Sequence, residues 1–297
     1  MSEGTEPAPH DDRPDDARSR AVLITGCSSG IGRATAERLV NAGWRVYATA
    51  RRTESIADLA ALGCRTLALD VTDEESMRSA VASVEEAEGA VGALVNNAGY
   101  SQSGAMETLP MERLRAQFET NVFGLVRMCQ LALPSMRRTG WGRIVNVSSM
   151  GGRMTFPGGG AYHATKHAVE AMSDALRYEV RGFGVDVVVV EPGLIKTRFG
   201  ETAAGSIDAE VGSEEPYAAF NAAVKEATAG AYEGPLARLG GGPDAVARTI
   251  ERAISAKRPR TRYKVTASAH LILGQRRLLT DRAWDGFLRT QFPSPGP

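Results

Sequence analysis

The sequence has few cysteines and no excess charge of either sign, which argues against a disulfide-stabilised protein and against a nucleic-acid-binding protein. Its three cysteines, Cys27, Cys64 and Cys129, stand far apart without a CxxC pair, so we expect free thiols in a reducing, cytoplasmic compartment. The 35 basic residues balance 35 acidic ones, which leaves no overall electrostatic attraction to nucleic acid. The four histidines show no metal-ligand spacing, and we predict no metal site.

Long apolar runs are also missing. No stretch reaches the roughly 18 uncharged apolar residues of a transmembrane helix. Residues 1–19 are rich in Asp, Glu, Arg and Pro and contain almost no apolar residues, so we expect a disordered tail. These residues also lack the basic start and apolar segment of a secretory signal.

From residue 21 the sequence alternates between strand-like and helical patterns. Continuous apolar runs such as Val187–Val190 suit strands that are buried on both faces. The pattern predicts the α/β class, with one doubly wound parallel sheet, helices on both faces and a single domain over residues 20–266. The predicted strands are 21–25, 44–49, 65–69, 92–96, 142–148, 184–190 and 261–265.

A segment without strand signal spans residues 194–242. It is rich in Ala, Gly and Glu and predicts one helix around residues 216–232. A long insertion at this place favours a substrate loop or lid, and a plain solvent loop is the alternative. Residues 267–297 are expected to form a C-terminal helical extension.

A glycine-rich turn follows the first strand-like run. The segment from Thr25 to Gly32 reads Thr-Gly-Cys-Ser-Ser-Gly-Ile-Gly and opens a helical segment. Glycines permit a tight turn and let backbone N–H groups approach a pyrophosphate at a helix N-terminus. The strand before the turn and the helix after it favour a dinucleotide site, although the spacing is GxxxGxG rather than GxGxxG.

Tyr162 and Lys166 stand four residues apart at the start of another helical segment. Side chains at this spacing lie on one helix face, so the ammonium can stand beside the phenol. A nearby cation lowers the pKa of a phenol from about 10, which lets Tyr162 give or take a proton near neutral pH. We interpret the neighbouring His163 and His167 as structural or solvent-facing residues that point away from this face.

Two further strand ends carry polar or small residues. Asn96–Gly99 follow an apolar run and leave room for a flat ring against the backbone. Ser149 ends another strand thirteen positions before Tyr162, where its hydroxyl can donate a hydrogen bond to a substrate oxygen.

Together these residues resemble the short-chain dehydrogenase/reductase family, in the branch defined by TGxxxGxG, NNAG and YxxxK. The resemblance covers about residues 21–265 and implies a Rossmann-like fold. It implies that Tyr162 is the general acid/base and that Lys166 lowers its pKa and binds the nicotinamide ribose. It also implies that Ser149 polarises the substrate carbonyl and that Asn121 holds a water in a proton relay.

The same resemblance implies the cofactor contacts. The glycine turn would wrap the pyrophosphate, residues 70–71 would border the adenine, and residues 97–99 would flank the adenine ribose and nicotinamide. Residues 192–197 would bind the carboxamide. The implied set is Gly26, Ser28, Ser29, Gly30, Ile31, Gly32, Arg51, Arg52, Asp70, Val71, Asn97, Ala98, Gly99, Tyr162, Lys166, Pro192, Gly193, Ile195 and Thr197.

The residues after the second strand predict NADP(H) rather than NAD(H). NAD sites place a carboxylate about 20 residues past the glycine turn, where it binds the ribose 2′-hydroxyl. This chain has Ala50 at the position where the family carries that Asp, followed by Arg51 and Arg52. A guanidinium can pair with a 2′-phosphate through charge-assisted hydrogen bonds. A solvated arginine pair is the alternative.

We therefore expect an NADP(H)-dependent ketoreductase or alcohol dehydrogenase and a homo-oligomer. The region around Tyr162 and the tail after Pro243 also resemble hydroxysteroid and retinol dehydrogenases, which suggests an apolar carbonyl or alcohol substrate. An enzyme that works mainly in the oxidative direction and a non-catalytic dinucleotide-binding sensor remain alternatives, although the intact tetrad argues against a sensor. The expected substrate walls are Met150, Met154, Phe156 and Phe199.

The region from residue 257 to 290 is locally basic, with nine Lys or Arg against Asp281 and Asp285. Apolar residues recur among these charges at helical spacing, so the segment can pack on the domain or on a second subunit, or lie on a membrane surface. We favour packing over membrane contact because Gly274 and Gly286 are expected to interrupt the helix.

Overall fold

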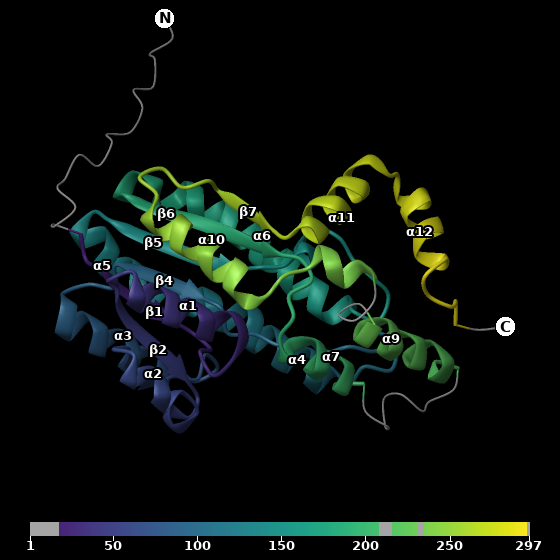
Figure 1. The fold of residues 1–297 in the computed structure, drawn as a ribbon, viewed down its shortest axis with the longest axis horizontal. Helices are drawn as coiled ribbons and strands as arrows, with labels where there is room; N and C mark the ends of the chain where they lie inside the picture. Colours follow the sequence, from purple (N-terminus) through teal and green to yellow (C-terminus); the bar gives the residue numbers. More distant parts are fainter. Residues whose placement is uncertain (1–17, 208–215, 231–234, 296–297) are drawn as a thin grey trace, which may run out of the picture.

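The computed structural model describes residues 18–207, 216–230 and 235–295. Its 7-stranded sheet has the order β3-β2-β1-β4-β5-β6-β7, and every neighbouring pair is parallel (Figure 1). All predicted strand segments join this sheet, which confirms the predicted doubly wound α/β class. The strands are β1 (Ala21–Ile24), β2 (Arg45–Ala50), β3 (Arg65–Ala68), β4 (Ala93–Asn96), β5 (Gly142–Val147), β6 (Val185–Pro192) and β7 (Arg262–Val265).

Helices cover both faces because the central strands are apolar on both sides, as in β6, where Val187–Val190 are buried. One face packs α1 (Gly30–Asn41), α2 (Ala57–Ala61) and α10 (Pro243–Ser255) against the sheet. The other face packs α3 (Glu74–Glu88), α5 (Gly124–Thr139) and α6 (Gly160–Val180). The strand order reverses between β1 and β4, and ligands bind at the carboxyl ends of strands beside such a switch point.

The expected lid segment contains two α-helices among its described residues. α9 (Ala218–Gly230) corresponds to the predicted helix, whereas α7 (Arg198–Gly205) was not predicted. Phe220 of α9 packs against Ala105 in a small cluster apart from the main core. The remainder of the predicted helix beyond residue 230, and the expected tail at residues 1–17, lie outside the described residues.

Two further helices follow β7, α11 (Ala267–Leu278) and α12 (Asp281–Arg289), at the end of the sheet where α7 and α9 also lie (Figure 1). The expectation that Gly274 and Gly286 interrupt the helix is wrong, since each lies inside one. The break falls at Leu279, which is extended, and Thr280 caps α12. Tertiary packing overrides the weak helix propensity of glycine here.

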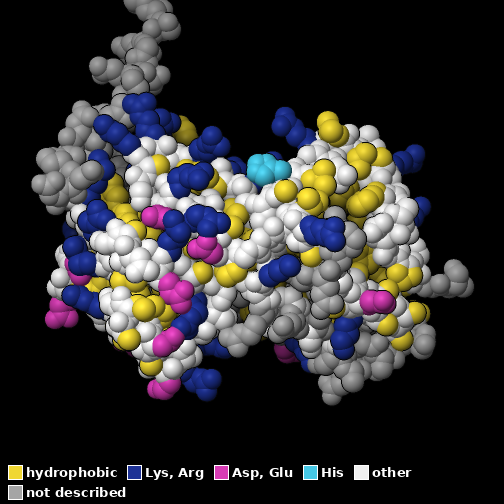
Figure 2. Space-filling model, viewed as in Figure 1, with side chains coloured by type: hydrophobic (Ala, Val, Ile, Leu, Met, Phe, Trp, Pro, Cys, Tyr) yellow, Lys and Arg dark blue, Asp and Glu magenta, His cyan; other side chains and the backbone are white. Residues whose placement is uncertain are grey.

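The inward faces of these helices pack on the domain. Trp284 is buried in a cluster with Met150, Met154 and Leu273, and its Nε1 donates to Thr155 O at 3.4 Å. Leu271, Leu278 and Phe287 remain exposed on the outer side. Figure 2 shows hydrophobic side chains with scattered Lys and Arg on the surface where α11 and α12 lie. None of the helices in the described part of the chain has the length and hydrophobicity needed to cross a membrane.

Candidate active site

The glycine turn forms a cradle that side chains would fill. Gly26 and Gly30 adopt φ values of +75° and +59°, which favour glycine. A Cβ at Gly32 would lie 2.3 Å from Gly26 O and 2.5 Å from Asn97 Nδ2. Ser29 is the N-cap residue of α1, but its side chain accepts no capping hydrogen bond, and the first turn of the helix contains no acidic residue. The N–H groups of this first turn, which no side chain at the N-cap binds, and the helix dipole suit a bound phosphate, so the turn fits a dinucleotide.

Hydrogen bonds join the ends of β1 and β4 beside this cradle. Thr25 Oγ1 accepts hydrogen bonds from the backbone N–H groups of Asn97 and Ala98, both at 3.0 Å. Asn97 Nδ2 in turn donates to Thr25 O at 2.9 Å and to Gly26 O at 3.0 Å. Thr25 was absent from the predicted site. Its position between the buried strand and the first glycine was the signal that could have found it.

Arg51 and Arg52 extend from the carboxyl end of β2, next to the buried Ala50. Both are exposed, and neither guanidinium forms a hydrogen bond or an ion pair with a residue that the structure describes. Two exposed cations at this strand end are available to an anionic group on a ligand in the cradle.

Lys166 is the buried cation of the site. Its Nζ donates to Val147 O at 2.8 Å and lies 5.8 Å from the centroid of the Tyr162 ring. Burial lowers the pKa of Lys166 to about 8, and the charge of Glu170 opposes this effect. Since the phenol and the ammonium share one face of α6, the arrangement can shift a proton to or from a ligand.

Ser149 and Asn121 lie near this pair and differ in whether their hydrogen-bond donors are available to a ligand. Ser149 Oγ accepts a hydrogen bond from Gly151 N at 3.0 Å, which leaves its own hydroxyl hydrogen available to a ligand. Asn121 is buried in a π-helical turn (Glu119–Phe123), and its Nδ2 donates to Tyr100 O at 2.9 Å and to Thr165 Oγ1 at 3.1 Å. Both donor hydrogens of Asn121 are therefore used by protein groups.

The segment after β6 returns to the glycine turn. A Cβ at Gly30 would lie 3.4 Å from Thr197 Cγ2, so the expected pyrophosphate and carboxamide segments are neighbours. Gly193 N donates to Val265 O at 3.0 Å, and a Cβ at Gly193 would lie 2.4 Å from Ser268 Oγ. Asp70 lies in the turn after β3 and accepts hydrogen bonds from Thr72, with Val71 buried beside it.

The expected substrate walls divide into two groups. The ring of Phe199 lies 5.4 Å from the Tyr162 ring, at the centre of the site. Met150 and Met154 are instead buried in the cluster beneath the C-terminal helices, and Phe156 packs on Trp284 at 6.0 Å between ring centroids. Packing with the C-terminal helices therefore accounts for the burial of three of the four side chains expected to line the substrate site.

Of the two readings given for His163, the structural one is confirmed and the solvent-facing one is not. Its ring is buried and lies 5.7 Å from the Tyr162 ring, with Nδ1 at 3.0 Å from Gly151 O. Burial lowers the pKa of His163 to about 4, so the ring is neutral and Nδ1–H donates to the carbonyl. His167 is exposed, as expected of a solvent-facing residue.

Known proteins are similar to this chain in sequence and in fold. The family described as short chain dehydrogenase matches residues 20–206. The uncharacterized oxidoreductase YbbO of Escherichia coli (strain K12) is 34% identical over 271 residues, which cover 91% of this chain and 94% of that protein. The NADPH-dependent 3-dehydrocapnine reductase of Ornithobacterium rhinotracheale is 35% identical, covering 90% and 95%. A short-chain dehydrogenase structure from Streptomyces avermitilis superposes with a TM-score of 0.71 at 34% identity, covering 92% and 98%.

Proposed function

Because this chain belongs to the short-chain dehydrogenase/reductase family and is an oxidoreductase of that family, we propose that it is an NADP(H)-dependent ketoreductase with Tyr162 as its general acid/base. The observation that carries the proposal is the pairing of Tyr162 with the buried Lys166 on α6, beside the free hydroxyl hydrogen of Ser149.

The residues divide the chemistry among them. When bound, the nicotinamide supplies a hydride to the substrate carbon or accepts one from it. Ser149 donates a hydrogen bond to the substrate oxygen and fixes its position. Tyr162 donates its phenolic proton to that oxygen during reduction, and the Lys166 ammonium lowers the pKa of the phenol. Asn121 supports the site by tying Tyr100 to Thr165.

NADP(H) is the proposed cofactor because the second strand ends in cations rather than a carboxylate. The glycine cradle would hold the pyrophosphate, and Arg51 and Arg52 would hold the 2′-phosphate. One relative is named as an NADPH-dependent reductase, which agrees with this choice. The carboxamide would lie against Pro192–Thr197.

The proposed substrate is an apolar ketone. Phe199 on α7 is the aromatic neighbour of Tyr162, and α7 belongs to the segment 194–242 that we propose as a lid. The name of a relative that reduces a 3-dehydro compound favours a ketone over an aldehyde.

A screen of NADPH oxidation against a diverse panel of carbonyl compounds tests this function, with Tyr162→Phe protein as the control for background oxidation. We expect turnover of one or more apolar ketones by the natural protein alone. Equal turnover with NADH would refute the cofactor choice. Binding of NADPH without turnover of any carbonyl or the matching alcohols would favour the dinucleotide sensor.

A further inference from the structure

A short turn holds Ser149 at the proposed site. It is the 3₁₀ turn η4 (Met150–Gly152), which follows β5, and Ser149 is its N-cap residue. Gly151 N donates to Ser149 Oγ at 3.0 Å, so this N–H group occupies one lone pair of the hydroxyl oxygen. The orientation of the Ser149 hydroxyl therefore depends on the position of Gly151.

The imidazole of His163 binds the other side of Gly151. Its Nδ1–H donates to Gly151 O at 3.0 Å, while the N–H of the same glycine binds the Ser149 hydroxyl. A Cβ at Gly151 would lie 2.4 Å from His163 Nδ1 and 3.4 Å from Ser149 Oγ. Only glycine lets the two side chains come this close to one backbone segment, so a shift of the imidazole would move the hydroxyl as well.

The His163 ring is held in place on α6. A Cβ at Gly159 would lie 2.7 Å from His163 Nε2, and the ring of Phe156 lies 6.1 Å from the imidazole between centroids. His163 is 8% exposed and directly follows Tyr162 on the same helix. Because Ser149 and Tyr162 belong to different elements, a donor fixed on α6 can set the position of one relative to the other.

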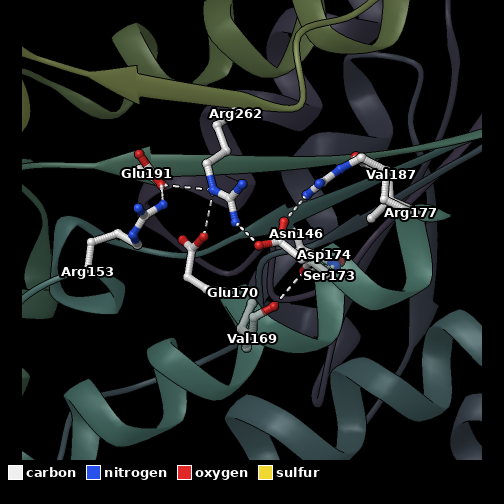
Figure 3. A network of polar contacts seen from close by, with 10 residues as sticks. All are labelled: Asn146, Arg153, Val169, Glu170, Ser173, Asp174, Arg177, Val187, Glu191 and Arg262. Atoms are coloured by element: carbon white, nitrogen blue, oxygen red, sulfur yellow. Dashed lines mark hydrogen bonds and ion pairs between the residues drawn. The ribbon is translucent and has the colours of Figure 1, made fainter.

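The far end of the turn is held by a network of charged side chains (Figure 3). Arg153, which follows η4, has its Nη1 3.6 Å from Glu191 Oε1 on β6, and Arg262 Nε lies 3.4 Å from the same oxygen. Arg262 also donates to Glu170 Oε2 on α6 at 3.0 Å. These ion pairs hold the end of the turn between the sheet and α6. They do not involve Gly151, whose carbonyl is bound by the imidazole instead.

We propose that His163 is a positioning residue that acts through the Gly151 backbone to orient the Ser149 hydroxyl toward the substrate oxygen. The inference rests on the proposed function, in which Ser149 donates a hydrogen bond to that oxygen. His163 transfers no proton in the reaction, because its Nδ1–H stays on Gly151 O. Without this anchor the hydroxyl should sample several directions, and its hydrogen bond to the substrate oxygen should weaken in the transition state.

A double-mutant cycle on the full chain tests the proposal. The assay is NADPH oxidation with the ketone of the carbonyl panel that the natural protein reduces fastest. Rates are expressed per NADPH-binding site, measured by cofactor fluorescence, so that unfolded protein does not contribute to the result. Ser149→Ala should lower kcat by about 100-fold, as expected for the loss of one donor to the reacting oxygen.

His163→Leu removes the donor to Gly151 O and should lower kcat by about tenfold, with NADPH affinity unchanged. In Ser149→Ala protein the same change should lower kcat by about twofold at most, because no hydroxyl is left to orient. His167→Leu, one turn further on the exposed side of α6, is the matched control and should keep the natural kcat.

Two further variants separate the hydrogen bond from the bulk of the ring. His163→Asn keeps an amide nitrogen near the place of Nδ1 and should restore most of the kcat that His163→Leu loses. His163→Gln places its amide near the place of Nε2, on the Gly159 side, and should behave like His163→Leu. If His163→Leu does not fold, His163→Gln takes its place in the cycle.

An equal loss of kcat in the natural and Ser149→Ala backgrounds would overturn the inference, because His163 would then act through Tyr162 or through the fold. So would an unchanged kcat in folded His163→Leu protein, or a His163→Asn variant no more active than His163→Leu. Absence of turnover by the natural protein, or full activity of Ser149→Ala, would instead refute the proposed function. The two failures are therefore distinguishable.

Discussion

His163 should make the protein lose stability in mild acid. His163 is 8% exposed, its ring packs against the rings of Phe156 and Tyr162, and its Nδ1–H donates to Gly151 O. Burial lowers its pKa from 6.5 to about 4 in the folded chain. Between these two values the unfolded chain binds the extra proton, so stability is complete above pH 6.5 and falls as the pH drops toward 4. The shift corresponds to about 3 kcal/mol, a large part of a typical folding free energy of ~5–15 kcal/mol.

Urea unfolding at pH 7, 5.5 and 4 measures this contribution. Asparagine at position 163 keeps an amide donor near Gly151 O but cannot titrate, so His163→Asn should be less stable at pH 7 and should lose about 3 kcal/mol less than the natural protein on acidification. His167→Asn, on the exposed side of the same helix, should keep the natural pH dependence. If His163→Asn retained the full acid slope, the buried neutral imidazole would not be its source.

Three further outcomes follow from the same geometry. Arg51→Ala should raise the KM for NADPH by about 10–100-fold and leave the KM for NADH unchanged, because it removes a charge-assisted hydrogen bond of ~1.5–3 kcal/mol. An unaltered preference for NADPH over NADH would contradict the role of Arg51 in binding the 2′-phosphate. Tyr162→Phe should lower the rate of ketone reduction by ~10²–10⁴-fold and retain NADPH binding. Lys166→Ala should lose both ketone reduction and NADPH binding, as measured by kinetics and cofactor fluorescence. Trp284→Ala should cost about 3–5 kcal/mol in urea unfolding, and truncation after Thr266 should impair folding or activity. Co-sedimentation with anionic liposomes that the truncation abolishes would instead support the membrane alternative.

The strands and the glycine turn could be predicted because their signals are local. A parallel strand buried on both faces must be a short apolar run, and only glycine fits where a Cβ at Gly32 would lie 2.3 Å from Gly26 O. The order of these signals along the chain then fixes which strand ends meet. The resemblance to a family added roles for Tyr162 and Lys166, and the structure brings their side chains to one face of α6.

Contacts between distant segments could not be predicted in the same way. Met154 and Phe199 are both apolar residues near the expected site, yet Met154 packs beneath Trp284 while Phe199 contacts Tyr162. Periodicity shows which side chains are buried but not which partner buries them. Likewise Arg262 and Glu170 lie 92 residues apart, and nothing in either local sequence pairs them.

The C-terminal extension is linked to the proposed nicotinamide segment through its first residues. Thr266, the one non-glycine residue at positive φ among those the structure describes, has φ of 84° where α11 begins. Such backbone strain costs about 1–3 kcal/mol for a β-branched residue and persists only where neighbouring contacts hold it. Here Thr266 Oγ1 lies 2.8 Å from Ser268 Oγ, and Ser268 Oγ accepts from Leu194 N at 3.1 Å. Since Gly193 approaches the same hydroxyls too closely for any Cβ, the extension positions the turn that follows β6.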